Sequence, residues 1–315
     1  MKKKVLIAGG SGFIGSHLSE KLLKAHFEVT VVDSLVTGRK KNIAGLMSQG
    51  LHFVEADINS PESFKLKELS GTFDQIYNLA SPASPIDFPK MPIFILETAT
   101  HGHKNLLELA KRTGARILFA SSSEVYGDAE VHPQVESYFG NVNSFGPRSC
   151  YDEAKRVGEA LSLGYKKEFG VEIRIARIFN TYGPKMRPSD GRIIPNFFSQ
   201  SLGGKALSIF GDGKQTRSFC YVSDLVDGLF LLMQSQVDTP VNLGNPIERS
   251  VLEIAEKIKV LTSSSSKLEF SPIGENDPKQ RRPDISKARE LLKFSPQIDL
   301  ETGLKNSLAY FKSET

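Results

Sequence analysis

Short runs of β-branched residues alternate with longer amphipathic stretches along the first 178 residues of the chain. Repeated strand–helix–strand units of this kind build a parallel sheet with helices on both faces. We therefore predict an α/β fold, a Rossmann-type doubly wound parallel sheet. The expected strands span residues 4–8, 28–33, 51–55, 75–79, 116–120 and 172–176. The expected helices include residues 15–25, 93–113 and 151–169.

The pattern changes after residue 178, where segments punctuated by proline and glycine alternate with shorter helical stretches. We expect a Rossmann domain over residues 1–178 and a smaller C-terminal α/β substrate lobe over residues 179–315. Part of the segment 219–245 is expected to pack back on the first domain.

The charge balance restricts the classes of partner. The 315 residues include 40 basic and 36 acidic side chains, a formal net charge of +4. Charges spread in this way favour neither nucleic acid nor a membrane surface as a partner. No segment holds the ~20 apolar residues of a membrane span, and the apolar run after the basic start is too short for a secretory signal.

The numbers and spacing of cysteine and histidine favour neither disulfide bonds nor a metal site. Two cysteines, Cys150 and Cys220, are too few for a disulfide framework. The histidines show no paired ligand spacing except His101 and His103, which fall on different faces of an expected helix. We expect a cytoplasmic protein without a metal site.

A glycine-rich loop follows the first expected strand and opens the first expected helix. Its glycines are Gly9, Gly12 and Gly15, with Phe13 and Ile14 between the last two. Glycines let the backbone turn tightly and approach a pyrophosphate, which is bound by the amides and positive end of the helix. The sequence therefore predicts a dinucleotide site.

An acidic residue, Asp33, ends the second expected strand. This is close to the ~20-residue offset at which an acid accepts hydrogen bonds from the adenosine ribose and repels a 2′-phosphate. We expect NAD rather than NADP, although Arg39 and Lys40 leave NADP open at this point. Asp57, after the third expected strand, is a candidate acceptor for the adenine amine. The other expected cofactor contacts are Phe13, Ile14, Ile58, Leu79, Ala80, Tyr151 and Lys155.

Tyr151 and Lys155 lie four residues apart on an expected helix, and therefore on one face of it. A neighbouring ammonium and the positive nicotinamide ring would favour the phenolate, so Tyr151 is a candidate base for a hydroxyl proton. Ser122 follows the expected strand 116–120, at the carboxyl edge of the sheet where cofactors bind. Its hydroxyl is expected to orient the same substrate alcohol.

These residues resemble the extended short-chain dehydrogenase/reductase family, and the resemblance to its UDP-glucuronate decarboxylases covers nearly the whole chain. Relatives often have threonine where this chain has Ser122, and both hydroxyls donate and accept hydrogen bonds. The matching segments of the first domain are NLASPASP (78–85), SEVYGD (123–128), GPRSCYDE (146–153) and ARIFNTYGP (176–184). Those of the second are GR (191–192), QTR (215–217), YVSDL (221–225), VNLGNP (241–246) and RPDI (282–285).

The resemblance implies a reaction in which NAD is used catalytically. C4 of UDP-glucuronate is oxidised, CO2 leaves from the resulting β-keto acid, C5 is protonated, and bound NADH reduces C4 again to give UDP-xylose. By this resemblance Tyr151 is the base and later the acid, Lys155 tunes it and holds the ribose, and Ser122 binds the same hydroxyl. Glu124 and Arg217 are implied in ring distortion, carboxylate binding or proton transfer, without separate roles.

The UDP group is expected in the smaller lobe, where arginines suit phosphates. Arg148 is either a second contact to the carboxylate or a residue that stabilises a turn. The expected substrate-binding residues are Ser123, Arg148, Asn180, Arg192, Phe210, Arg217 and Arg282.

Three alternatives stay open. A nucleotide-sugar 4-epimerase or 4,6-dehydratase would share the glycine loop, but dehydratases are expected to carry an Asp-Glu pair at positions 123–124 and simple epimerases commonly lack the acid. Ser123 and Glu124 fit neither pattern. A catalytically silent NAD-binding regulator would have a damaged triad, whereas Ser122, Tyr151 and Lys155 are all present. An apiose-forming relative would need the same oxidation and loss of CO2.

The two long expected helices also indicate an assembly. Helices 93–113 and 151–169 have apolar faces wide enough to pair across a two-fold axis as a four-helix bundle, as in related enzymes. We expect a homodimer.

Overall fold

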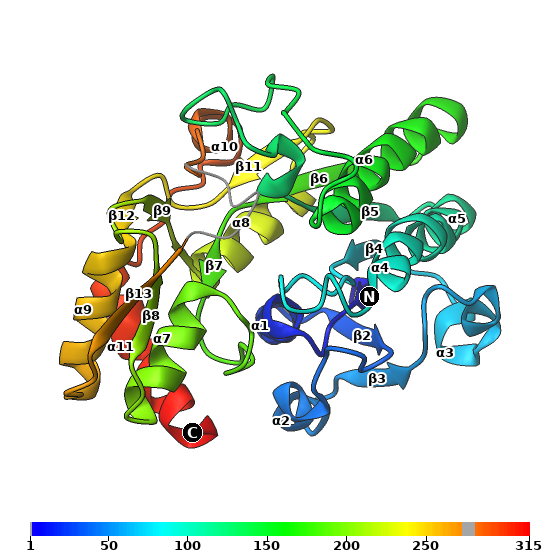
Figure 1. Ribbon diagram of the computed structural model, residues 1–315. Helices are drawn as coiled ribbons and strands as arrows, with labels where there is room; N and C mark the ends of the chain where they lie inside the picture. Colours follow the sequence, from blue (N-terminus) through cyan, green and yellow to red (C-terminus); the bar gives the residue numbers. More distant parts are fainter. Residues whose placement is uncertain (1, 273–280) are drawn as a thin grey trace.

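The computed structural model describes residues 2–272 and 281–315, and its centre is a parallel sheet of seven strands (Figure 1). The strand order is β11-β6-β5-β4-β1-β2-β3, and every neighbouring pair is parallel. The predicted Rossmann-type fold is confirmed. The strands are β1 (Lys4–Ala8), β2 (Glu28–Asp33), β3 (His52–Glu55), β4 (Gln75–Asn78), β5 (Arg116–Ser122), β6 (Ile173–Ile178) and β11 (Val241–Leu243).

Both faces of the sheet are buried, because alternate residues of each strand enter two different cores. Along β1, Val5 and Ile7 belong to one hydrophobic cluster, and Leu6 and Ala8 to the other. The helices α1 (Phe13–Lys24) and α8 (Val222–Gln234) cover the first face.

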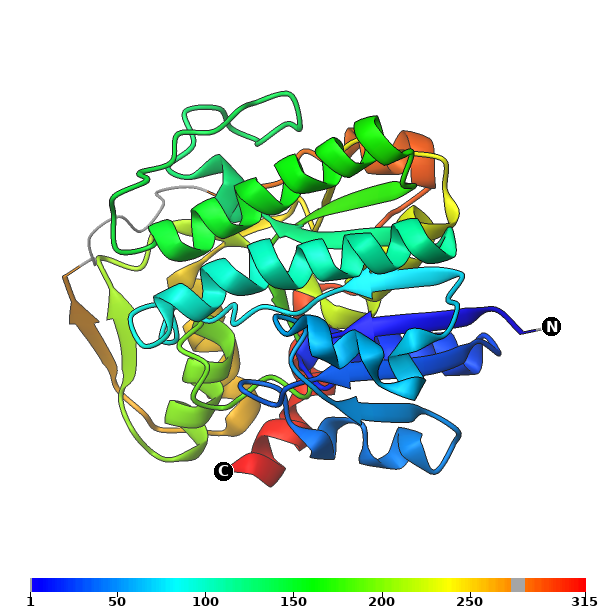
Figure 2. The same ribbon diagram turned by 90° about the vertical axis from the view of Figure 1, so that its right-hand side faces the viewer.

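The opposite face is covered by two long helical columns (Figure 2). One is α6 (Ser149–Phe169). The other, expected as one helix over 93–113, consists of α4 (Pro92–Glu97), the π-helical turn η3 (Thr98–Gly102) and α5 (His103–Thr113).

The C-terminal part forms a smaller lobe beside the carboxyl edge of the sheet (Figure 1). Segment 219–245 contains α8, which packs on the sheet, and β11, which is its edge strand beside β6. The lobe's helices are α7 (Ile193–Leu202), α9 (Val251–Thr262) and α11 (Leu300–Glu314). Its strand pairs are β8 (Leu207–Phe210) with β13 (Leu268–Ser271), β9 (Thr216–Ser218) with β12 (Glu248–Ser250), and β7 (Thr181–Tyr182) with β10 (Cys220–Tyr221).

The remaining helical segments are short. Among the described residues, no helix is long and apolar enough to cross a membrane. These segments are η1 (Lys40–Asn42), α2 (Ala44–Met47), η2 (Pro61–Lys65), α3 (Lys67–Ser70), η4 (Ser123–Tyr126) and α10 (Ser286–Leu292).

Candidate active site

A cavity of about 480 Å³ lies between the carboxyl edge of the sheet and the smaller lobe. The glycine loop after β1, the end of β5 and the segment after β6 line it from the sheet side. Residues 185–197 and the β8–β9 region line it from the lobe side. The cavity is therefore at the position where open parallel sheets bind their ligands.

The glycine loop leaves no room for side chains. Gly9 has a φ of +78°, and a Cβ there would lie 2.7 Å from the amide nitrogen of Ala80. A Cβ on Gly15 would lie 2.3 Å from the carbonyl oxygen of Gly9. Gly12 precedes α1 and provides no side-chain cap to its amides. The loop therefore fits a diphosphate, whose charge the open helix N-terminus can bind.

A second, smaller cavity continues from the glycine loop and contains Asp33 and Asp57. The carboxylate of Asp33 accepts hydrogen bonds from the amides of Ser11 and Leu35, both at 2.9 Å. Burial raises the pKa of Asp33 despite these two bonds. The walls on either side include the expected residues Ile58, Leu79 and Ala80.

The two cations near Asp33 have partners of their own. Arg39 donates hydrogen bonds to Glu314 at 2.8 Å and to the hydroxyl of Tyr310 at 3.2 Å. The ammonium of Lys40 lies 5.1 Å from the ring centroid of Phe53. Arg39 is therefore already paired with an acid, and Lys40 lies against an aromatic ring.

Tyr151 and Lys155 project from the first turns of α6 toward the end of β5. The Ser122 side chain hydrogen-bonds the Tyr151 phenol, whose ring stacks on Phe88 with centroids 4.8 Å apart. The Lys155 ammonium donates to the carbonyl of Ala120 at 2.9 Å and lies 5.4 Å from the centroid of the tyrosine ring. The structure therefore brings the expected serine, tyrosine and lysine together.

The protonation of this group differs from the simplest expectation. Burial raises the pKa of Tyr151 to about 12, and the charge of Glu124 adds to this, whereas Ser122 and Arg192 lower it. Burial also lowers the pKa of Lys155 to about 8. Because Lys155 is bound to a backbone carbonyl, Arg192 and Ser122 favour the phenolate instead. The phenol by itself is protonated at neutral pH.

Glu124 lies two residues beyond Ser122, on η4, between two arginines. Its carboxylate is 2.9 Å from Nη2 of Arg148 and 2.7 Å from Nη1 of Arg281. Burial alone would raise the pKa of Glu124, but Arg281, Arg148 and the nearby Arg217 outweigh it and lower the pKa. Glu124 is therefore an ionised carboxylate within a cluster of three arginines.

The structure places Arg282, an expected substrate contact, outside the cavity. Arg281 lines the cavity and Arg282 does not; Arg282 lies instead 3.6 Å from Glu248 on β12. Arg281 forms a β-bridge with Arg217, and successive residues of an extended segment point to opposite sides. Two adjacent arginines carry no signal in sequence for which of them faces inward.

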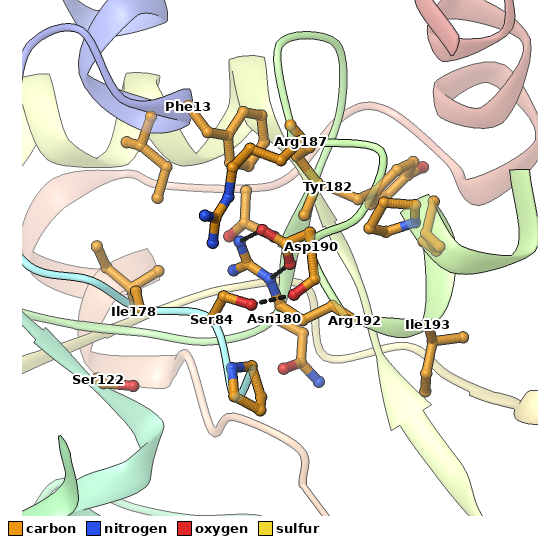
Figure 3. Close-up of a pocket in the computed structure, with 18 of the residues that line it drawn as sticks. Phe13, Ser84, Ser122, Ile178, Asn180, Tyr182, Arg187, Asp190, Arg192 and Ile193 are labelled. Atoms are coloured by element: carbon orange, nitrogen blue, oxygen red, sulfur yellow. Dashed lines mark hydrogen bonds and ion pairs between the residues drawn. The ribbon is translucent and has the colours of Figure 1, made fainter. Parts of the chain in front are cut away.

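The loop over residues 185–192 closes the lobe side of the cavity (Figure 3). Arg192 ion-pairs with Asp190, whose backbone carbonyl accepts a hydrogen bond from Ser84. Arg187 ion-pairs with Asp87 in the same way. The sequence analysis included Arg192 but missed its neighbour Asp190, and it missed Ser84 and Asp87, which come from a segment about a hundred residues away.

The other expected site residues line one cavity or both. Those in the larger cavity are Gly9, Gly12, Phe13, Ile14, Gly15, Leu79, Ser122, Ser123, Glu124, Arg148, Tyr151, Lys155, Asn180, Arg192, Phe210 and Arg217. Those in the smaller cavity are Gly9, Gly12, Asp33, Asp57, Ile58, Leu79 and Ala80.

Known proteins that resemble this chain include enzymes that act on nucleotide sugars. The chain is 51% identical over 314 residues to UDP-glucuronic acid decarboxylase 1 of Danio rerio, covering 99% of this chain and 73% of that protein. Among solved structures, UDP-glucose 4-epimerase of Thermotoga maritima with UDP-glucose superposes with a TM-score of 0.91 at 28% identity, covering 98% of this chain and 99% of the other.

A second solved structure carries both a nucleotide sugar and the dinucleotide. UDP-glucuronic acid 4-epimerase of Bacillus cereus, in complex with UDP-glucuronic acid and NAD, has a TM-score of 0.86 at 30% identity, covering 98% of this chain and 99% of the other. The family model described as "NAD dependent epimerase/dehydratase family" matches residues 5–244. With its glycine loop, Ser122, Tyr151 and Lys155 arranged at one sheet edge, the chain belongs to the NAD-dependent epimerase/dehydratase family.

Proposed function

We propose that this protein decarboxylates UDP-glucuronate to UDP-xylose. The glycine loop and Asp33 would hold NAD, which would supply reversible oxidation at C4 of the sugar. The observation that carries the proposal is Glu124, an ionised acid held by Arg148 and Arg281 in the same cavity as Tyr151. The chain's 51% identity to a UDP-glucuronic acid decarboxylase supports it.

The charge of the cavity suits this substrate, which carries a diphosphate and a carboxylate. Cationic side chains outnumber the acids on its walls, and arginine binds both groups in a bidentate manner. The acids are Glu124 and Asp190. The cations are Arg39, Arg148, Lys155, Lys185, Arg187, Arg192, Arg217 and Arg281.

Tyr151 is the proposed proton acceptor for the C4 hydroxyl. The Ser122 hydrogen bond places a donor beside the phenol and favours its ionised form. Lys155 keeps its positive charge below about pH 8, and it stands one helical turn from Tyr151, where it suits a ribose hydroxyl. Returning the proton to the C4 oxygen at the end of the cycle restores Tyr151.

Loss of CO2 leaves negative charge at the sugar, and C5 must then gain a proton. Preorganised cations stabilise such charge because they need no reorganisation during the reaction. Arg217 and Arg281 are adjacent across a β-bridge and both act on Glu124. We assign the stabilisation of this charge and the protonation of C5 to Glu124, Arg217 and Arg281 acting together.

Three finer assignments belong to this proposal. The cofactor is NAD rather than NADP, since Asp33 lies in the smaller cavity and Arg39 is paired with Glu314. The protein forms a homodimer through the helical columns of α4–α5 and α6, which expose Ile93 and Leu163. It works in the cytoplasm, consistent with two unpaired cysteines.

The test is to incubate the pure protein with UDP-glucuronate, with and without added NAD, and to follow CO2 and the sugar nucleotide by mass spectrometry and NMR. We expect UDP-xylose without net NADH. A UDP-4-keto-pentose accumulating with NADH would mean oxidation without return of the hydride. UDP-galacturonate would indicate a 4-epimerase, and no turnover despite NAD binding would contradict the proposal.

A further inference from the structure

Asp152 is a buried carboxyl to which the proposed reaction assigns no role. It follows Tyr151 in the first turn of α6 and is 7% exposed, yet it does not line the cavity. Its Oδ1 atom is buried without a hydrogen-bond partner in the part of the chain that the structure describes. A carboxyl in this position needs either a compensating charge or a proton.

Burial and charges of both signs act on the pKa of Asp152. Burial is the largest effect and raises its pKa, Glu124 raises it further, and Arg148 and Arg281 lower it, which leaves the pKa raised to about 7. Its own helix adds a smaller upward effect from Glu153. The titratable groups that act on Asp152 or respond to it are Glu124, Arg148, Arg281, Glu153, Cys150 and Tyr151.

The charges of the same two arginines act on both Glu124 and Asp152. Glu124 forms ion pairs with Arg148 at 2.9 Å and Arg281 at 2.7 Å, and the charges of both arginines also act on Asp152. Two carboxyls that share one set of cations do not ionise independently. As long as Glu124 is ionised and bound to the arginines, Asp152 is favoured in its protonated form.

We propose that Asp152 is a positioning residue for Glu124: it is protonated while Glu124 binds both arginines, and as a carboxylate it becomes the counter-charge of Arg148 when Glu124 turns toward the substrate. The proton that Asp152 loses goes to water, and no bond of the substrate changes at Asp152. The inference rests on the proposed function, because it assigns Glu124 to the C5 side of that reaction. It predicts that decarboxylation is faster above neutral pH than below it.

The kinetic test compares the pH dependence of kcat in the wild type and two variants of Asp152. In the wild type, kcat should rise about tenfold from pH 6 to pH 8, the change in ionised fraction of a group that titrates near 7. Asp152→Asn should stay at the low-pH rate throughout, with KM for UDP-glucuronate changed by less than about twofold. Asp152→Glu should restore the rise.

The matched control is Glu153→Gln, which removes the same charge one residue along, where the side chain is partly exposed and 3.5 Å from Arg156. Its profile should keep the rise. If Asp152→Asn keeps the rise, or if it lowers kcat by one factor at every pH, Asp152 has only a structural role and the proposal is overturned.

A second measurement does not depend on activity. In protein labelled with ¹³C at the aspartate carboxyls, the Asp152 resonance, assigned by its loss in Asp152→Asn, should titrate near pH 7. In Glu124→Gln it should titrate at lower pH, because a neighbouring negative charge has gone.

The two measurements separate the two proposals. Absence of UDP-xylose from UDP-glucuronate would contradict the proposed function, and the NMR titration would still decide whether Asp152 and Glu124 are coupled. An Asp152 resonance that titrates near pH 4 in the wild type and does not move in Glu124→Gln would overturn the inference about Asp152.

Discussion

The two walls of the cavity are built in different ways. The cofactor wall, residues 9–15 with Asp33, comes from one strand–loop–helix unit and the next strand, and it is shaped by backbone atoms and by the absence of side chains. The substrate wall, which consists of Glu124, Arg148, Arg217 and Arg281, comes from four separate segments and is held by ion pairs. The first wall depends on steric space and the second on charge.

Substitutions on the two walls should therefore affect different ligands. A change of volume on the cofactor wall should weaken NAD binding and leave the substrate site intact. A change of charge on the substrate wall should weaken substrate binding and leave NAD binding intact, because ion pairs stabilise that wall and backbone packing stabilises the other.

The largest effect is expected from Arg281→Gln. Removing one partner of a buried ion pair leaves the other charge uncompensated, and we expect kcat/KM for UDP-glucuronate to fall about 100-fold. The Kd for NAD, measured by calorimetry, should change by less than about twofold, because Arg281 lies outside the cofactor wall.

The matched control for Arg281 is its neighbour. Arg282→Gln removes an equal charge that is 40% exposed and paired at 3.6 Å with Glu248, so kcat/KM should change by less than about threefold. Equal losses in the two variants would show that the cavity-facing position of Arg281 has no importance.

A smaller effect is expected from Gly15→Ala. The added Cβ would lie 2.3 Å from the carbonyl oxygen of Gly9, so the loop must move. Overpacking of this kind costs about 1–3 kcal/mol, and we expect the Kd for NAD to rise about 30-fold while the Kd for UDP stays the same.

The control for Gly15→Ala is Gly45→Ala on the exposed helix α2, where a Cβ would meet nothing within 4 Å. It should leave NAD binding unchanged and slightly raise the melting temperature, since alanine favours helix over glycine. A weaker affinity for UDP in Gly15→Ala would show that the two walls are not independent.

The smallest effect is expected from salt. Raising the ionic strength from 0.1 to 1 M shortens the Debye length from about 10 to about 3 Å, so KM for UDP-glucuronate should rise about threefold. The Kd for NAD should change less, because the cofactor wall binds through backbone amides. An equal response of both constants would contradict the difference between the walls.

Much of the fold and of the cofactor wall could be predicted from the sequence, because the relevant signals are local. The alternation of β-branched and amphipathic stretches indicated the parallel sheet, and two strands, β1 and β2, begin and end where they were expected. The expected helix over 93–113 was less accurate, since hydrophobic periodicity does not reveal the π turn at Thr98–Gly102.

The sequence alone determined the features that depend on short spacings. The glycines at positions 9, 12 and 15 and the pair Tyr151 and Lys155 act within one or two turns of a helix, where the period of 3.6 residues sets which side chains meet. In this chain they predicted the dinucleotide site and placed Tyr151 and Lys155 on one face of a helix.

Only the tertiary structure decided how the substrate wall is assembled. It placed Arg281 rather than Arg282 on Glu124, bound Lys155 to the carbonyl of Ala120, and buried Asp152 behind the cavity. Each outcome depends on contacts between segments far apart in the chain, and on which side of an extended strand a residue faces. Local sequence carries neither kind of information, because burial and long-range ion pairs arise only when the lobe and the sheet pack together.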